Sequence, residues 1–126
     1  MPAVPYVEIK IGTDHRLEYP IASKATGLPI DITGWVLSWM AKRRQSDLDA
    51  AAVLTKTTAG GGITITGVFN ADPALNAQVA RVTIADDDTA ALEPYLYVCE
   101  LKRIDPGFET ILSSGMLNLD YAVHRA

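Results

Sequence analysis

The feature that most constrains this chain is the alternation of apolar and polar side chains within short segments. In the first of these, Val7, Ile9 and Ile11 share one parity, while Glu8 and Lys10 share the other. A period of two is typical of a strand with one buried face. The same pattern, or a run of β-branched residues, recurs at residues 17–21, 35–42, 53–58, 63–66, 79–84, 95–102, 108–112 and 116–123. The sequence therefore predicts about eight or nine short strands.

Turn-forming residues separate these segments at intervals of roughly ten residues. They include residues 31–34, the triplet Gly60-Gly61-Gly62, residues 70–76 and the sequence Asp105-Pro106-Gly107. Residues 43–51 are polar and charged, and we expect an exposed loop or a short helical turn there. No segment is long and helical enough to cross over between parallel strands, so the strands should be antiparallel and should close as a β-sandwich.

Residues 86–92 are the one segment with helical character. Asp86, Asp87 and Asp88 occupy what would be the first turn, and Pro94 follows the segment. Acidic side chains cap a helix N-terminus and favour its positive dipole end, so this pattern predicts one short helix near residues 86–92. The same carboxylates could hold a hard cation such as calcium, but consecutive acids lack the alternate spacing and the glycine bend of a calcium loop. Helix capping is the favoured interpretation.

Charge and composition limit the partners that the chain can bind. It carries 15 acidic and 11 basic side chains, a net charge of -4, without a concentrated basic stretch. This balance argues against binding to nucleic acid or to anionic lipid. No apolar run approaches the roughly 20 residues of a membrane-spanning helix. With 48% apolar and 21% charged residues, the composition is typical of a packed globule, and we expect a single domain over residues 1–126.

The start of the chain and its single cysteine bear on where the protein resides. The first residues lack the basic start and the apolar run of a signal peptide. Cys99 is the only cysteine, so it has no internal partner for a disulfide. These features predict a protein kept in a reducing cytoplasm. Because Cys99 lies on the apolar side of a predicted strand, we expect an inert buried thiol rather than an activated nucleophile.

Histidines are the other candidates for chemistry. His15 follows Asp14 and lies near Glu18 in the sequence, which could make it a general base or a metal ligand. A metal site could also combine His15 with the aspartates of residues 86–88. The second histidine, His124, lies close to the end of the sequence. Histidines at loop and tail positions are more often simply solvated, and we predict no catalytic residue, no metal and no cofactor.

Two further motifs have structural interpretations. The glycine triplet at residues 60–62 lacks the Gly-Lys-Ser/Thr ending of a phosphate-binding loop, so it predicts a turn. The basic run at residues 42–44 could bind an acidic partner. Asp47 and Asp49 follow it and largely cancel its charge, which favours a solvated strand end.

The aromatic residues offer a second candidate function. Those considered are Tyr6, Tyr19, Trp35, Trp39, Tyr95, Tyr97 and Tyr121. Most of them alternate in phase with aliphatic residues, which predicts that they point into the core. An exposed pair of rings could instead stack against the C–H faces of sugars. A carbohydrate-binding module is therefore the alternative function.

Short motifs along the chain resemble those of one known class of domain. They are Asp31-Ile32-Thr33-Gly34-Trp35, then Gly60-Gly61-Gly62-Ile63-Thr64-Ile65, then Val82-Thr83-Ile84 with Asp88-Thr89, and then Leu92, Tyr95 and Tyr97. Over about residues 7–121 the chain resembles the small immunoglobulin-like β-sandwich domains of tailed bacteriophages, such as the N-terminal domain of baseplate upper proteins and related tail and virion modules. Tyr97-Val98-Cys99 also resembles the tyrosine corner of immunoglobulin domains, although no earlier cysteine exists to pair with Cys99.

This resemblance implies an antiparallel immunoglobulin-like β-sandwich of about seven to nine strands. It also implies a non-enzymatic structural or assembly protein of a phage or prophage, found in the virion and, during assembly, in the host bacterial cytoplasm. The partners would be other virion proteins or further copies of the chain, with no small-molecule substrate. Contacts would use sheet edges and loops, and we expect docking at the N-terminal strand with its proline-rich lead and at residues 122–126.

Overall fold

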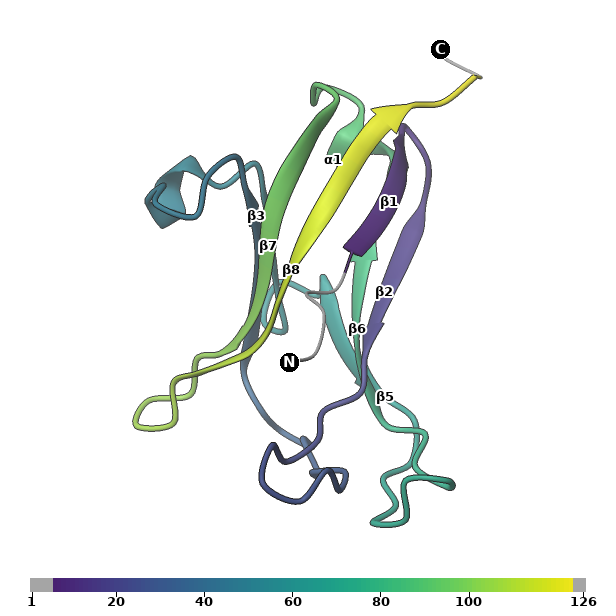
Figure 1. Ribbon diagram of the computed structural model, residues 1–126, viewed down its shortest axis with the longest axis vertical. Coiled ribbons are helices and arrows are strands. Elements are labelled where there is room, and N and C mark those ends of the chain that lie inside the picture. Colours follow the sequence, from purple (N-terminus) through teal and green to yellow (C-terminus); the bar gives the residue numbers. More distant parts are fainter. Residues whose placement is uncertain (1–5, 124–126) are drawn as a thin grey trace.

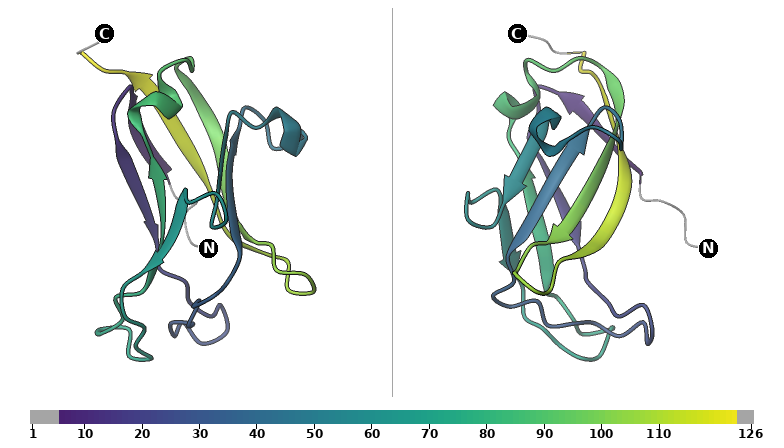
Figure 2. Two further views of the ribbon diagram at one scale, coloured as in Figure 1. Left: turned by 180° about the vertical axis from the view of Figure 1, so that it is seen from behind. Right: turned by 90° about the vertical axis from the view of Figure 1, so that its left-hand side faces the viewer.

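The structure is a computed structural model that describes residues 6–123. These residues fold into two facing β-sheets (Figure 1). The strands are β1 (Tyr6–Ile11), β2 (His15–Tyr19), β3 (Leu37–Lys42), β4 (Leu54–Thr57), β5 (Ile63–Thr66), β6 (Val79–Ile84), β7 (Tyr95–Arg103) and β8 (Thr110–Tyr121), and the helices are η1 (Asp49–Ala51) and α1 (Asp86–Thr89). The larger sheet has the strand order β1-β8-β7-β3-β4, and the smaller sheet has the order β2-β6-β5. Figure 2 shows the sheets as two layers with loops at both ends. The predicted all-β sandwich is confirmed.

The strand order follows the immunoglobulin arrangement. Strands β2, β6 and β5 correspond to its B, E and D strands, and β8, β7, β3 and β4 correspond to its G, F, C and C′ strands. Strands β1 and β8 pair in parallel, with Tyr6 opposite Met116 and Ile11 opposite Tyr121. The expectation of wholly antiparallel sheets is wrong at this pair. The two strands lie far apart in the sequence, and the rest of the sandwich supplies the long connection that a parallel pair needs.

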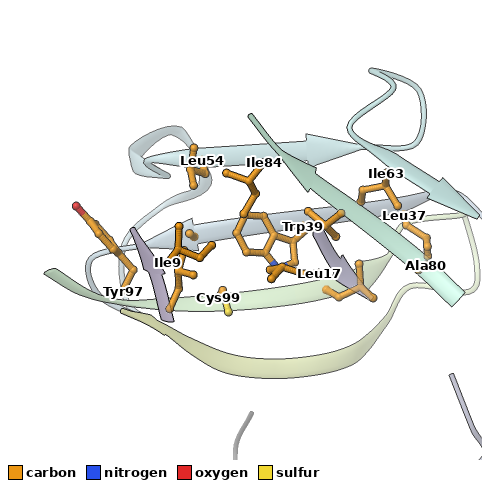
Figure 3. Close-up of a cluster of buried hydrophobic side chains, with 14 of the residues drawn as sticks. Ile9, Leu17, Leu37, Trp39, Leu54, Ile63, Ala80, Ile84, Tyr97 and Cys99 are labelled. Atoms are coloured by element: carbon orange, nitrogen blue, oxygen red, sulfur yellow. The ribbon is translucent and has the colours of Figure 1, made fainter. Parts of the chain in front are cut away.

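One cluster of buried side chains in residues 6–123 fills the space between the sheets (Figure 3). Trp39 and Tyr97 are its largest members, and both are fully buried. Ala41, Cys99 and Gly115 stand opposite one another in β3, β7 and β8. This row of small residues leaves room for the large rings beside it. The other buried aliphatic residues are Ile9, Leu17, Ile21, Ile32, Leu37, Leu54, Ile63, Ala80, Val82, Ile84, Leu101, Leu117 and Leu119.

A side-chain hydrogen bond joins the two sheets through the core. The indole Nε1–H of Trp39, in β3, donates to the hydroxyl of Tyr19, in β2, over 3.1 Å. A buried donor left without an acceptor costs about 1–3 kcal/mol. The bond therefore favours one way of setting the smaller sheet against the larger one.

Gln78 fixes the predicted turn at residues 31–34. Its side chain is buried at the start of β6, where its Oε1 accepts from the backbone N–H of Ile32 over 3.0 Å. Its Nε2 donates to Asp31 Oδ1 over 3.1 Å and to Thr33 Oγ1 over 3.0 Å. The connection between β2 and β3 is thus tied to the smaller sheet. The sequence does not indicate that Gln78 holds this turn, because its three partners are more than 40 residues away.

Tyr97 forms a tyrosine corner, as expected from the resemblance of residues 97–99 to that motif of immunoglobulin domains. Its hydroxyl donates to the backbone carbonyl of Glu93 over 2.9 Å, just before β7 begins. Burial is the main cause that raises the pKa of Tyr97 above its ordinary value, which keeps the hydroxyl protonated as a donor. The bond fixes the path by which the chain leaves α1 and enters β7.

Residues 108–112 and 116–123, predicted as two strands, form the single strand β8. The register with β7 shifts within it, since Leu101 pairs with Ser113 while Lys102 pairs with Ile111. The residue between them is the extra residue of a β-bulge. The Ser-Ser-Gly sequence expected to break the strand instead stays extended, because β7 pairs with it along its whole length.

Three element boundaries also differ from the prediction, and the first is that of β2, which runs from His15 to Tyr19 rather than over residues 17–21. Helix α1 ends at Thr89 rather than near residue 92, and a turn follows in which the N–H of Leu92 donates to the Thr89 carbonyl over 2.9 Å. Strand β3 begins at Leu37, so Trp35 lies in the loop before it. The predicted loop at residues 43–51 is confirmed, and it contains η1.

Replacing Tyr97 with phenylalanine tests the tyrosine corner. The change removes the hydrogen bond to the Glu93 carbonyl, and we expect the free energy of unfolding to fall by about 1 kcal/mol, measured by urea denaturation. Tyr95→Phe is the matched control, because the Tyr95 side chain is 41% exposed and its change should stay within about 0.5 kcal/mol. Equal losses in the two variants would contradict the role given to Tyr97.

Candidate interaction site

The acidic run at residues 86–88 serves the start of α1. The Asp88 carboxylate accepts from the backbone N–H of Ala85 over 2.7 Å and pairs with Lys56 Nζ over 2.6 Å. Burial raises the pKa of Asp88, but Lys56 and the Ala85 N–H lower it by more, so it lies below its ordinary value. The N–H of Asp86 donates to Asp14 Oδ1 over 2.7 Å. The capping interpretation is confirmed, and residues 6–123 contain no cluster of three or more His, Cys, Asp or Glu side chains that could hold a metal ion.

His15 is held by a threonine rather than by the acids beside it in the sequence. The Thr13 hydroxyl donates to the Lys10 carbonyl over 2.6 Å, so the 2.8 Å contact between Thr13 Oγ1 and His15 Nε2 requires the ring nitrogen to donate. In residues 6–123, His15 and the aspartates of residues 86–88 do not form a group of three or more side chains that could hold a metal ion. His124 lies outside the described residues.

Cys99 is buried, as expected. Burial raises the pKa of its thiol to about 11, and burial also raises the pKa of the neighbouring Tyr19 to about 12. A protonated thiol beneath the sheet is a poor nucleophile. The glycine triplet is a turn between β4 and β5, in which the Gly60 N–H donates to Thr57 Oγ1 over 2.9 Å and Gly61 has a φ of 83°.

The basic run at the end of β3 is neutralised by nearby acids. Lys42 Nζ pairs with Asp49 over 2.7 Å and Arg43 with Glu93 over 3.1 Å. A longer contact of 4.0 Å joins Arg44 to Asp47. The predicted solvated strand end is confirmed, and its charges leave little net field for an acidic partner.

The aromatic residues divide between core and surface, so the prediction that most of them point inward is only partly correct. Trp39 and Tyr97 are fully buried, whereas Tyr6, Tyr95 and Tyr121 are exposed by 59%, 41% and 48%. Tyr95 and Tyr121 have the parity of buried residues but lie at strand ends, whereas Tyr6 shares the outward parity of Glu8 and Lys10.

Arginine side chains lie against three of the aromatic rings at the surface. The Arg103 guanidinium stands 3.9 Å from the centre of the Trp35 ring and 4.8 Å from that of Phe108, and Arg43 stands 5.3 Å from that of Tyr95. A sugar that used these ring faces would have to displace an arginine. Carbohydrate binding stays a prediction, without an observation that favours it.

The outer face of the larger sheet is hollowed into a cavity of about 450 Å³, which we call the sheet recess. Met40, Val98 and Met116 line it from β3, β7 and β8, and the last two are direct neighbours across the strands. The loop that carries η1 and the hairpin between β7 and β8 project on the same side of the sheet (Figures 1 and 2). They contribute Asp49 and Ile104 to the lining.

Charged side chains also line the sheet recess, where Glu100 on β7 stands opposite Met40 on β3. Lys42, Glu100 and Lys102 also line it, and Lys102 pairs with Glu109 over 3.7 Å. Within residues 6–123, Glu100 forms no ion pair. Apolar and charged side chains therefore alternate across the sheet recess. No short segment of the sequence indicates this surface, because Met40, Val98 and Met116 lie on three different strands.

A second opening lies at the side of the sandwich, between the edges of the two sheets. Strand β1 covers only residues 116–121 of β8, so in the described chain no strand pairs with that side of residues 110–115. A cavity of about 460 Å³ adjoins this uncovered edge, and Val7, Leu17, Tyr19, Ile21 and Leu112 line it. We call the uncovered edge and its cavity the side slot.

Comparison with models of known protein families finds no match for the chain, and a search of curated proteins finds none either. Neither short helix in residues 6–123 has the length and apolar character needed to cross a membrane. The fold and the two openings are therefore the basis for the functional argument.

The raised pKa of Cys99 predicts a loss of stability at high pH. The thiol of the unfolded chain releases its proton near the ordinary value of 9.0, while the folded thiol keeps it until about 11, so the free energy of unfolding should fall as pH rises between these values. Urea denaturation at a series of pH values measures this. Cys99→Ala is the control and should show a shallower fall, and an identical slope in both proteins would contradict the burial of the thiol.

Proposed function

We propose that this chain is a structural protein of a tailed bacteriophage or prophage, which acts through protein–protein contacts in the virion or tail and catalyses no reaction. The motifs that carry the resemblance to phage immunoglobulin-like domains support this proposal. They lie in a β-sandwich in which Trp35 precedes β3 and the Tyr97 hydroxyl donates to the Glu93 carbonyl. The protein would be found in the virion, and in the host bacterial cytoplasm during assembly.

The sheet recess is the observation that carries the proposal. It presents Met40, Val98 and Met116 to solvent on the face of the sheet turned away from the core. Apolar surface of this kind is stabilised when a partner covers it, at about 25 cal/mol for each Å² removed from water. Local contacts explain the polar candidates for chemistry. The acidic run caps α1, His15 bonds to Thr13, and Cys99 is buried.

The partner is a virion protein or a further copy of the chain. Lys42 and Lys102 together with Asp49 and Glu100 give the sheet recess both signs of charge, which selects a partner with a matching arrangement rather than a strongly charged polymer. This is consistent with the overall charge of -4.

The direct test is to look for the chain in phage particles. Particles would be induced from a strain that carries the gene, purified on a density gradient and analysed by mass spectrometry. We expect peptides of this chain at a constant copy number per particle. Purified particles without the chain would refute the proposed function.

The variant Val98→Lys tests the sheet recess as the contact surface. A lysine among Met40 and Met116 puts a charge where the partner would bury apolar surface, and we expect incorporation into particles to fall roughly tenfold or more. Val68→Lys is the matched control, because Val68 is a valine that is 79% exposed in the loop after β5. Urea denaturation checks that both variants stay folded. Equal incorporation of the two variants would exclude the sheet recess as the contact.

A further inference from the structure

We propose that residues 122–126 of one copy of the chain bind in extended form in the side slot of a second copy, and so join copies head to tail. The inference rests on the proposed function in one respect, because it names a second copy as a partner. It uses a different surface from the sheet recess, so the two can fail separately.

The side slot offers backbone groups for an added strand. Strand β8 pairs with β7 over residues 110–121, but β1 covers its other side only from Met116 to Tyr121. Half of the strand therefore presents a sheet edge that no strand in residues 6–123 covers. An extended segment can add to such an edge through main-chain hydrogen bonds, and alternate side chains then determine which segment fits.

The cavity beside this edge is suited to the apolar side chains of an added strand. Most of its lining is apolar and comes from Val7 in β1, from Leu17 and Tyr19 in β2, and from Ile21 and Leu112, while Arg16 and Glu18 of β2 also line it. A strand placed in line with β1 would direct every second side chain between the two sheets, on the same side as Val7 and Ile9. These side chains would cover core residues that the facing sheets leave open at this edge.

The chain's own first residues are poorly matched to this edge. Tyr6 stands opposite Met116, so an extension of β1 in register would set Pro5 opposite Gly115 and Pro2 opposite Leu112. The two prolines have opposite parity, and only alternate residues of a strand direct their N–H toward one neighbour. Whichever set of alternate residues directs its N–H groups toward β8, that set includes one proline, which has no N–H to donate.

The other end of β8 supplies a better segment. Val123 is 99% exposed, and residues 122–126 read Ala-Val-His-Arg-Ala, without proline or glycine. Figure 1 shows the chain at residues 122 and 123 running clear of both sheets. In the slot of another copy, the Val123 side chain would lie in the apolar cavity.

The segment cannot reach the slot of its own copy. Residues 115 and 122 are seven positions apart along an extended strand, a span of roughly 23 Å at 3.3 Å per residue. Five residues reach at most about 17 Å, so they cannot turn back, cover this span and still pair with the slot. The contact must form between copies. Because the donated and the accepting surfaces differ, the copies associate head to tail, as a ring or as a filament.

Sedimentation velocity and hydrogen exchange test the inference on the full chain. We expect self-association that Val123→Asp weakens roughly tenfold or more, since the charge would have to enter an apolar cavity. Val68→Asp is the matched control and should associate like the parent, because Val68 is also an exposed valine but lies far from β8 in the sequence. Amides of residues 110–115 should gain protection from exchange as the parent concentration rises, and they should not gain it in Val123→Asp.

Several outcomes would overturn the inference. They are a monomer at all concentrations, oligomers that Val123→Asp leaves unchanged, and protection that appears at the sheet recess but not at residues 110–115. A variant that lacks residues 2–5 tests whether the chain's own first residues occupy the side slot. If the monomer of this variant loses protection from exchange at residues 110–115, they do occupy it and the inference is wrong. Val123→Asp copies that enter particles and self-associate like the parent would overturn the inference and leave the proposed function intact.

Discussion

The packing of Trp39 between the two sheets is the constraint on which the rest of the structure depends. Its ring fills the centre of the core beside the small residues Ala41, Cys99 and Gly115, and its N–H is satisfied only by Tyr19 on the opposite sheet. A larger residue in that row would collide with the ring, and a different sheet orientation would bury the N–H unpaired. This one arrangement fixes the spacing and the facing of the layers, without a disulfide.

The same packing leaves β8 only half covered, and this has a functional consequence. Strand β8 follows β7 for its whole length, whereas β1 is half as long and pairs with its second part. The uncovered part opens onto the core at the side slot, while the sheet recess lies on the opposite face of the same sheet. The two surfaces that we propose as contacts would let the module meet two neighbours at once, which is what a component of a repeating assembly requires.

The sequence predicted the strands well where one face is buried and turn residues bound the segment, as at β6. It failed where the decision depended on a distant partner. Ser113-Ser114-Gly115 has the composition of a turn, but pairing with β7 keeps it extended. Tyr95 and Tyr97 share one parity, yet only Tyr97 is covered by the facing sheet. The candidate surfaces were harder still, because Met40, Val98 and Met116 become neighbours only when three strands from distant parts of the sequence align.

The sequence by itself determined that the chain is all β, that it turns at the glycine, proline and aspartate clusters, and that the aspartates at residues 86–88 cap a helix. These features are local, since side-chain periodicity and turn chemistry act over a few residues. Only the tertiary structure decided that β1 pairs in parallel with β8, that Gln78 holds the turn at residues 31–34, and that the larger sheet has a recess and an uncovered edge. Such features arise from contacts between residues far apart in the sequence, and their energies have no signature in any short segment.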